Sequence, residues 1–152
     1  NKLDLLNIIR NYVKNTKEVN SNIFAAEICN QLGFSRIISS DDPIDKKMNW
    51  KQVSEASKSD FLTIGGHSHT HQILSFLDSG QLTYELDTSI RLLKDKADIK
   101  PIHYSYPEGL EHCYSENVIK ELKKRGVLCC PTAMNGTNKI IDDLFHLKRV
   151  ML

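Results

Sequence analysis

The sequence lacks an excess of either charge and has no long apolar run. It contains 20 Lys and Arg residues against 19 Asp and Glu residues, so its formal net charge is +1. This balance gives no electrostatic reason to expect nucleic acid or an anionic membrane as a partner. No apolar stretch approaches the roughly 20 residues that a membrane-spanning helix needs. Internal repeats, linkers and low-complexity tracts are missing too, so 152 residues indicate a single globular domain.

The four cysteines form neither a metal-binding nor a disulfide pattern. None belongs to a CxxC pair, so a cysteine zinc site is not expected. Cys129 and Cys130 are adjacent, and a disulfide between neighbours would strain the peptide that joins them. We therefore expect reduced, mostly buried thiols. This slightly favours a cytoplasmic location, and the cell envelope stays open.

The first residues contain neither an initiator Met nor a signal peptide. Either a leader has been removed or the chain is part of a longer protein, and we expect the second. Residues 1–47 read as a helical segment. An apolar stripe from Leu3 to Val13 predicts one helix, and a second is predicted from about Ser21 to Leu32, with Gly33 as its end. The polar segment Ser39–Pro43 is predicted to be a turn.

From Met48 onwards the pattern alternates between short β-rich runs and helices. Asn49 and Ser115 are predicted N-caps, and Gly126 is a predicted helix end. A further helix carries Leu82, Leu86, Ile90 and Leu93 at helical spacing. Strands are predicted at Phe61–Ile64, Ile102–Tyr106 and Val127–Cys130, with a fourth at Leu147–Leu152. This βαβ rhythm is typical of an α/β protein with a parallel sheet or barrel, in which ligands bind at the carboxyl ends of the strands.

The strongest chemical signal is Gly65-Gly66-His67-Ser68-His69-Thr70-His71, which holds three of the six histidines. Neutral imidazole is a common ligand of zinc and similar metals. His67 and His71 are four residues apart, so one helical turn after the strand would place them on the same side, with His69 pointing away. A metal-free loop of polar histidines is the alternative reading.

Here the sequence resembles the polysaccharide deacetylases, the NodB-homology enzymes of the carbohydrate esterase family 4 type. The histidine segment followed by Gln72-Ile73-Leu74-Ser75 looks like the family's second motif, in which a His, three residues and another His supply two metal ligands. Tyr104-Ser105-Tyr106-Pro107-Glu108-Gly109 is similar to the third motif, which forms a wall of the active-site groove. The resemblance is good over 48–152 and poor over 1–47; its supporting segments are Trp50-Lys51-Gln52-Val53, Gly126 and Leu147-Lys148-Arg149-Val150.

The resemblance implies a distorted (β/α) barrel of the NodB type that removes N-acetyl groups from amino sugars. A divalent metal, zinc above all, would be held by His67 and His71. Tyr106, Pro107, Glu108 and Gly109 would line the substrate groove, with the backbone N–H of Glu108 donating to the developing oxyanion. The expected partner is an N-acetylated polysaccharide or oligosaccharide.

The sequence also departs from the family. The first motif, a Thr-Phe-Asp-Asp-Gly-like segment that supplies the third ligand and the general base, has no match; Asp41-Asp42 reads as a polar loop. We expect this motif upstream of Asn1, the barrel to be incomplete without it, and the 152-residue chain to be inactive alone. Ser105 stands where many members have Arg, and Glu108 where many have Tyr. Leu144-Phe145-His146 matches the late Leu-x-His motif only faintly.

Two other classes remain open. His67-Ser68-His69 or His69-Thr70-His71 could be the HxH pair of an amidohydrolase-like or PHP-like hydrolase, although only His103, His112 and His146 follow as further ligands. Alternatively, the chain could be a degenerate, non-catalytic carbohydrate-binding domain that has kept the fold.

Overall fold

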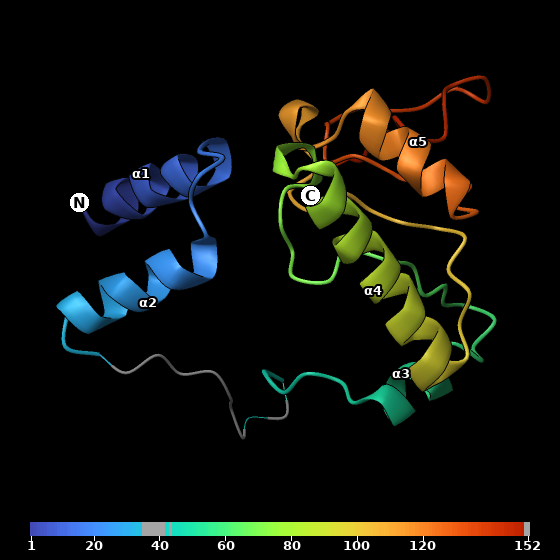
Figure 1. The fold of residues 1–152 in the computed structure, drawn as a ribbon, viewed down its shortest axis with the longest axis horizontal. Coiled ribbons are helices and arrows are strands. Elements are labelled where there is room, and N and C mark those ends of the chain that lie inside the picture. The colour runs from blue at the N-terminus through green and yellow to red at the C-terminus, as the bar shows by residue number, and fades with distance from the viewer. Residues whose placement is uncertain (35–41, 43, 151–152) are drawn as a thin grey trace. The chain divides into compact units, whose positions relative to one another are not determined.

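The structure, a computed structural model, describes residues 1–34, 42 and 44–150, and these form two compact units, Asn1–Lys47 and Met48–Leu152 (Figure 1). The predicted turn at Ser39–Pro43 lies outside the described residues, apart from Asp42. None of the helices in the described part of the chain combines the length and the apolar character that crossing a membrane requires.

The described residues of the first unit form two helices, α1 (Lys2–Asn15) and α2 (Ser21–Gln31), which confirms both predicted helices. The side chain of the asparagine that precedes each helix accepts hydrogen bonds from backbone N–H groups of the first turn. Such caps satisfy donors that have no partner within the helix. Tyr12 and Phe24 bring their ring centroids to 5.6 Å and so link the two helices.

The second unit contains three α-helices and two short 3-10 helices: α3 (Trp50–Ala56), η1 (Leu74–Phe76), α4 (Ser79–Ala97), η2 (Glu111–Cys113) and α5 (Glu116–Lys124). The predicted caps are confirmed. The Asn49 side chain accepts from the N–H of Gln52, and the Ser115 side chain accepts from the N–H of Val118. Gly126 follows α5 with a φ of 82°, the left-handed conformation that ends helices.

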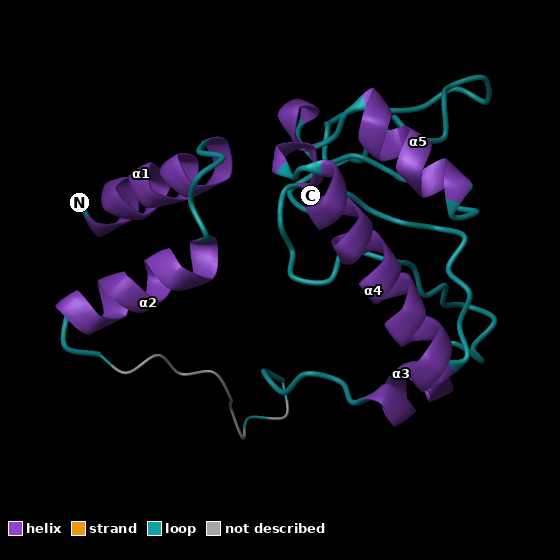
Figure 2. Cartoon of the chain, viewed as in Figure 1, coloured by secondary structure: helices purple, strands orange, loops and turns teal. Residues whose placement is uncertain are grey.

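The predicted strands are reduced to isolated parallel bridges, and no β-strand occurs among the described residues (Figure 2). The bridges pair Gly66 with Tyr104, His103 with Cys129, and Asn135 with Arg149. Their parallel direction agrees with the βαβ pattern, but the expected strand at Phe61–Ile64 is wrong. The reason is exposure: Phe61 is 96% exposed. Parallel ladders are found where both faces are covered, and this segment lacks such cover.

The core of the second unit lies where α4 and α5 meet the bridge-forming segments. α4 contributes Leu82 and Leu86, and α5 contributes Val118, Ile119 and Leu122. The other members of the cluster come from the segments between and after the helices: Leu74, Tyr104, Tyr106, Val127, Cys130 and Phe145. Two of these, Tyr104 and Tyr106, flank Ser105. The core therefore fixes the backbone next to the histidine segment.

Candidate functional site

The histidine segment begins directly after the bridge residue Gly66. The N–H of Gly66 donates to the carbonyl of His103 at 3.0 Å, and the N–H of Ser105 donates to the carbonyl of Gly66 at 2.9 Å. These two bonds place His67 beside Ser105. Glycine at position 66 permits this close approach, because a Cβ there would lie 2.2 Å from the ring of Tyr104.

The rings of His67 and His71 lie together, with centroids 4.8 Å apart and planes inclined at 67°. The expected helical turn does not form. Instead, Ser68 and His71 both adopt left-handed backbone conformations, with φ values of 60° and 61°. The N–H of His71 donates to the Ser68 hydroxyl at 2.9 Å and closes the turn. The four-residue spacing of His67 and His71 therefore still brings the two rings together, but through a turn with left-handed residues and not through a helical turn.

Ser105 orients the His67 ring. Nδ1 of His67 lies 2.9 Å from the Ser105 carbonyl oxygen and 2.8 Å from the Ser105 hydroxyl. A carbonyl can only accept, so Nδ1 carries the hydrogen and Nε2 keeps its lone pair. Partial burial lowers the pKa of His67; the bond to Ser105 opposes that shift, while the neighbouring His71 and Arg149 add to it. The lowered pKa favours the neutral imidazole, the form that binds metals.

His69 is turned away from this pair. Its ring meets the ring of Tyr84 edge to face, with centroids 5.8 Å apart. Its backbone N–H donates to the carboxylate of Glu85 at 2.8 Å. The arrangement favours the pairing of His67 with His71 over either HxH pair.

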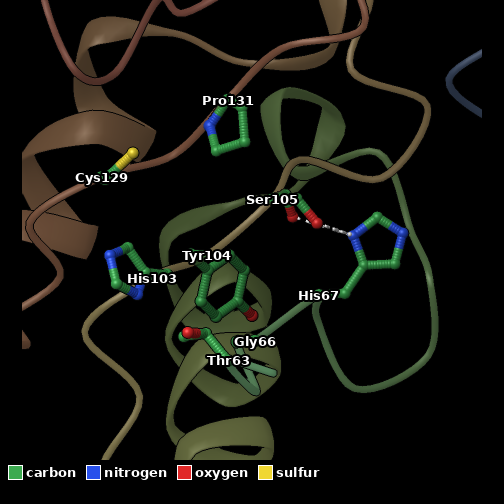
Figure 3. Close-up of a pocket in the computed structure, with 9 residues that line it drawn as sticks. Thr63, Gly66, His67, His103, Tyr104, Ser105, Cys129 and Pro131 are labelled. Carbon is green, nitrogen blue, oxygen red and sulfur yellow. Dashed lines mark hydrogen bonds between the residues drawn. The ribbon is translucent and has the colours of Figure 1, made fainter. Parts of the chain in front are cut away.

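A pocket of about 430 Å³ opens beside His67. In Figure 3, His67 and Ser105 lie at one side of it, and His103 and Cys129 lie at the other. The buried Nδ1 of His103 has no hydrogen-bond partner among the described residues. A buried polar atom of this kind is uncommon in proteins. The pocket therefore offers one oriented imidazole at its rim and one unsatisfied imidazole nitrogen in its wall.

The Tyr106–Gly109 segment, which directly follows Ser105, forms a tight turn, in which the N–H of Gly109 donates to the carbonyl of Pro107. Tyr106 and Pro107 are fully buried, and the Tyr106 hydroxyl donates to the carbonyl of Phe145 at 3.1 Å. Glu108 and Gly109 are left-handed, with φ values of 60° and 67°. Gly109 is also buried, so Glu108 is the one member of this turn that keeps some exposed surface. The expected role of the four residues at a substrate groove stays a prediction.

The remaining candidate ligands have other contacts. His112 stacks on Phe76 with centroids 6.0 Å apart, and Nδ1 of His146 lies 2.7 Å from a carboxylate oxygen of Asp143. Asp41 lies outside the described residues, and Asp42 accepts a hydrogen bond from the N–H of Ile44 as a turn residue. Within the described part of the chain, no three or more His, Cys, Asp or Glu residues are grouped so that they could hold a metal ion.

Two side chains, those of Glu85 and Tyr104, bond the backbone of the histidine segment in a way that the sequence analysis did not predict. Glu85 accepts from its backbone, and the Tyr104 hydroxyl, itself bonded to Ser89, accepts the N–H of Ser68 at 2.7 Å. No role was assigned to Glu85 from the sequence. One signal could have revealed it, because positions 82, 85, 86 and 89 follow helical spacing and form the buried face of α4.

The chain belongs to the polysaccharide deacetylase family, because the family model described as polysaccharide deacetylase matches residues 14–129, most of its length. The match extends further upstream than the motifs alone indicated. No curated protein sequence matched the chain.

Solved structures with a similar fold are also deacetylases. The chain is similar to the Streptococcus pyogenes deacetylase PplD in complex with acetate, with a TM-score of 0.61 and 18% identity over 83% of this chain and 56% of that one. It is similar to the BpsB deacetylase domain from Bordetella bronchiseptica, with a TM-score of 0.61 and 14% identity over 83% and 64%. A polysaccharide deacetylase from Bacillus cereus gives a TM-score of 0.57 and 20% identity over 86% and 43%. The chain thus has the fold of part of these deacetylases, spanning less than two thirds of each.

Proposed function

We propose that the protein is a metal-dependent hydrolase that removes N-acetyl groups from the amino sugars of a polysaccharide or oligosaccharide. The observation that carries this proposal is the pairing of the His67 and His71 rings at 4.8 Å beside a pocket. Membership of the polysaccharide deacetylase family supports the substrate class.

The residues present fit a zinc-like ion in part. His67 keeps an unprotonated Nε2 because Ser105 fixes its tautomer, and His71 lies next to it. Imidazole nitrogen is a preferred ligand of zinc, and the carbonyl of Ser105 is the kind of outer partner that metal-bound histidines have. When bound, a divalent ion polarises a carbonyl and lowers the pKa of a bound water. A third protein ligand is not among the described residues.

The chain's own residues would bind and orient the substrate. Ser105 holds the imidazole of His67 in one orientation, and a pocket of about 430 Å³ lies beside it. Glu108 follows Ser105 by three residues and is held in a left-handed conformation. We propose that its N–H donates to the oxygen that becomes negative when the acetamide is attacked.

We further propose that the barrel and the catalytic machinery are completed by a segment upstream of Asn1. An Asp-Asp pair there would supply the third ligand and the base that takes the proton of the attacking water. The chain covers only 43–64% of the similar deacetylases, so their fold contains parts that this chain does not match. The chain alone is then expected to bind metal weakly and to release no acetate.

Metal binding by the chain tests whether His67 and His71 are metal ligands. Zinc affinity of the chain should be measured by chelator competition, with His67→Ala and His71→Ala as test variants and His112→Ala as the matched control. Each test variant should weaken binding by at least about tenfold, while the control should bind as the unchanged chain does. A loss with His69→Ala but not with His71→Ala would overturn the assignment in favour of an HxH site.

Acetate release tests whether the protein is a deacetylase. A longer form of the protein that carries the upstream Asp-Asp segment should release acetate from N-acetylglucosamine oligomers, and His67→Ala in that form should abolish the release. Oligomer binding without acetate release by the metal-loaded longer form would establish the non-catalytic alternative instead.

A further inference from the structure

The segment between the two histidines has no regular secondary structure, yet each of its backbone N–H groups is bonded to a side chain. The N–H of Ser68 donates to the Tyr104 hydroxyl at 2.7 Å, and the N–H of His71 donates to the Ser68 hydroxyl. The N–H groups of His69 and Thr70 both donate to one carboxylate oxygen of Glu85, each at 2.8 Å. Side chains therefore replace the backbone partners that a helix or a sheet would supply.

Glu85 makes the largest contribution to this arrangement. Its other carboxylate oxygen accepts from the Thr70 hydroxyl at 2.6 Å, so the side chain receives three hydrogen bonds from two consecutive residues. It is only 3% exposed and forms no ion pair within the part of the chain that the structure describes. A buried carboxylate is unfavourable unless donors surround it. Here the loop itself provides those donors.

The backbone conformation explains why the loop needs such support. Ser68 and His71 are left-handed, which is unfavourable for residues with a Cβ. Strained conformations persist only where the surroundings hold them. Glu85 binds His69 and Thr70, the two residues between the strained positions, and so holds the loop at its middle.

We propose that Glu85 is the positioning residue that sets the conformation of the His67–His71 loop and thereby the geometry of its two imidazoles for metal binding. The metal part of this proposal rests on the proposed function, whereas the loop part does not. The relevant chemistry is a carboxylate binding consecutive backbone N–H groups, with a direct contact to neither imidazole. Because only four peptide bonds join His67 to His71, a shift of the backbone at His69 and Thr70 moves the two rings relative to each other.

The test compares Glu85→Gln with the unchanged chain. Glutamine keeps the size of the side chain but removes its charge and one acceptor oxygen, so the fold should persist. In the metal-free chain, hydrogen exchange measured by NMR should become at least about tenfold faster at the amides of His69 and Thr70, and remain unchanged at amides of α5. Zinc affinity, measured by chelator competition on the same samples, should fall by at least about tenfold.

A matched control separates positioning from general stability. Leu86→Ala truncates a buried side chain on the same helix that has no polar atom to accept from the loop amides, and it should destabilise the chain without changing zinc affinity. Unchanged exchange at His69 and Thr70 in Glu85→Gln would overturn the proposal. Faster exchange with unchanged zinc affinity would overturn the positioning role and leave Glu85 as a packing residue. If the unchanged chain binds no zinc, the proposed function fails, and the metal-free exchange experiment still decides whether Glu85 holds the loop.

Discussion

Gly66→Ala is the most direct perturbation of the contact between the two motif segments. A Cβ built on Gly66 would lie 2.2 Å from Cε2 and 2.4 Å from Cδ2 of Tyr104. Carbon atoms in contact normally lie about 3.5–4.0 Å apart, so the ring would have to retreat by roughly 1.3 Å. Tyr104 is 2% exposed and packs in the core, so it has no free space to enter.

The loss in the free energy of unfolding depends on the interactions that the Tyr104 ring and hydroxyl make. Overpacking a well-packed core costs about 1–3 kcal/mol. The Tyr104 hydroxyl also bonds the N–H of Ser68 and the hydroxyl of Ser89, and each such bond contributes about 1 kcal/mol. Gly66→Ala should therefore lower the free energy of unfolding by about 3–5 kcal/mol, a large share of the total for a domain of this size.

Urea unfolding followed by circular dichroism measures this change. Gly126→Ala is the matched control, because Gly126 is also a non-helical glycine but no atom lies within 4 Å of its built Cβ. With a φ of 82°, it should cost only the strain of a left-handed alanine, about 1–2 kcal/mol. In a Tyr104→Leu background the cost of Gly66→Ala should shrink, since the ring is gone. Gly66→Ala within about 0.5 kcal/mol of the unchanged chain would refute the reasoning.

Further predictions concern stability at alkaline pH and two more buried contacts. Burial raises the pKa of the Cys130 thiol from 9.0 to about 12, so the unfolded chain loses this proton first, and stability should fall by about 4 kcal/mol between pH 9 and pH 12. Urea unfolding across this range should show a shallower fall for Cys130→Ala, and parallel curves would contradict the assignment. Gly109→Ala should cost about 2–3 kcal/mol in the same assay, because Gly109 is left-handed and its Cβ would lie 2.7 Å from the N of Ala133. Ser89→Ala removes the acceptor of the buried Tyr104 hydroxyl and should cost about 1–3 kcal/mol, and an unchanged melting temperature would show that the bond contributes nothing.

Local signals in the sequence were sufficient for the helices. Asn49 and Ser115 cap their helices as predicted, because a cap depends only on residues within the first turn. The apolar spacing of Leu82 and Leu86 located α4 for the same reason. The strand at Phe61–Ile64 could not be decided locally, since a strand forms only where distant segments pair with it and cover it.

The candidate site was only partly predictable. The spacing of His67 and His71 indicated adjacent rings, and the structure brings the rings together, although through left-handed residues and not through a helical turn. The contribution of Glu85 escaped prediction because its charge suggested exposure, and its partners are backbone groups that a sequence motif does not represent. The metal role of the two histidines stays a prediction.

The dependence of the His67–His71 loop on distant side chains also determines when the site can form during folding. The acceptors of three of its N–H groups, those of Ser68, His69 and Thr70, lie on Tyr104 and on Glu85 of α4. Before α4 docks and Tyr104 pairs with Gly66, water is the only partner for these groups, so the loop cannot assemble early. A metal ion present during refolding meets flexible histidines that can bind it in non-native geometries. Metal added after refolding should therefore give a higher yield of correctly folded chain than metal added before.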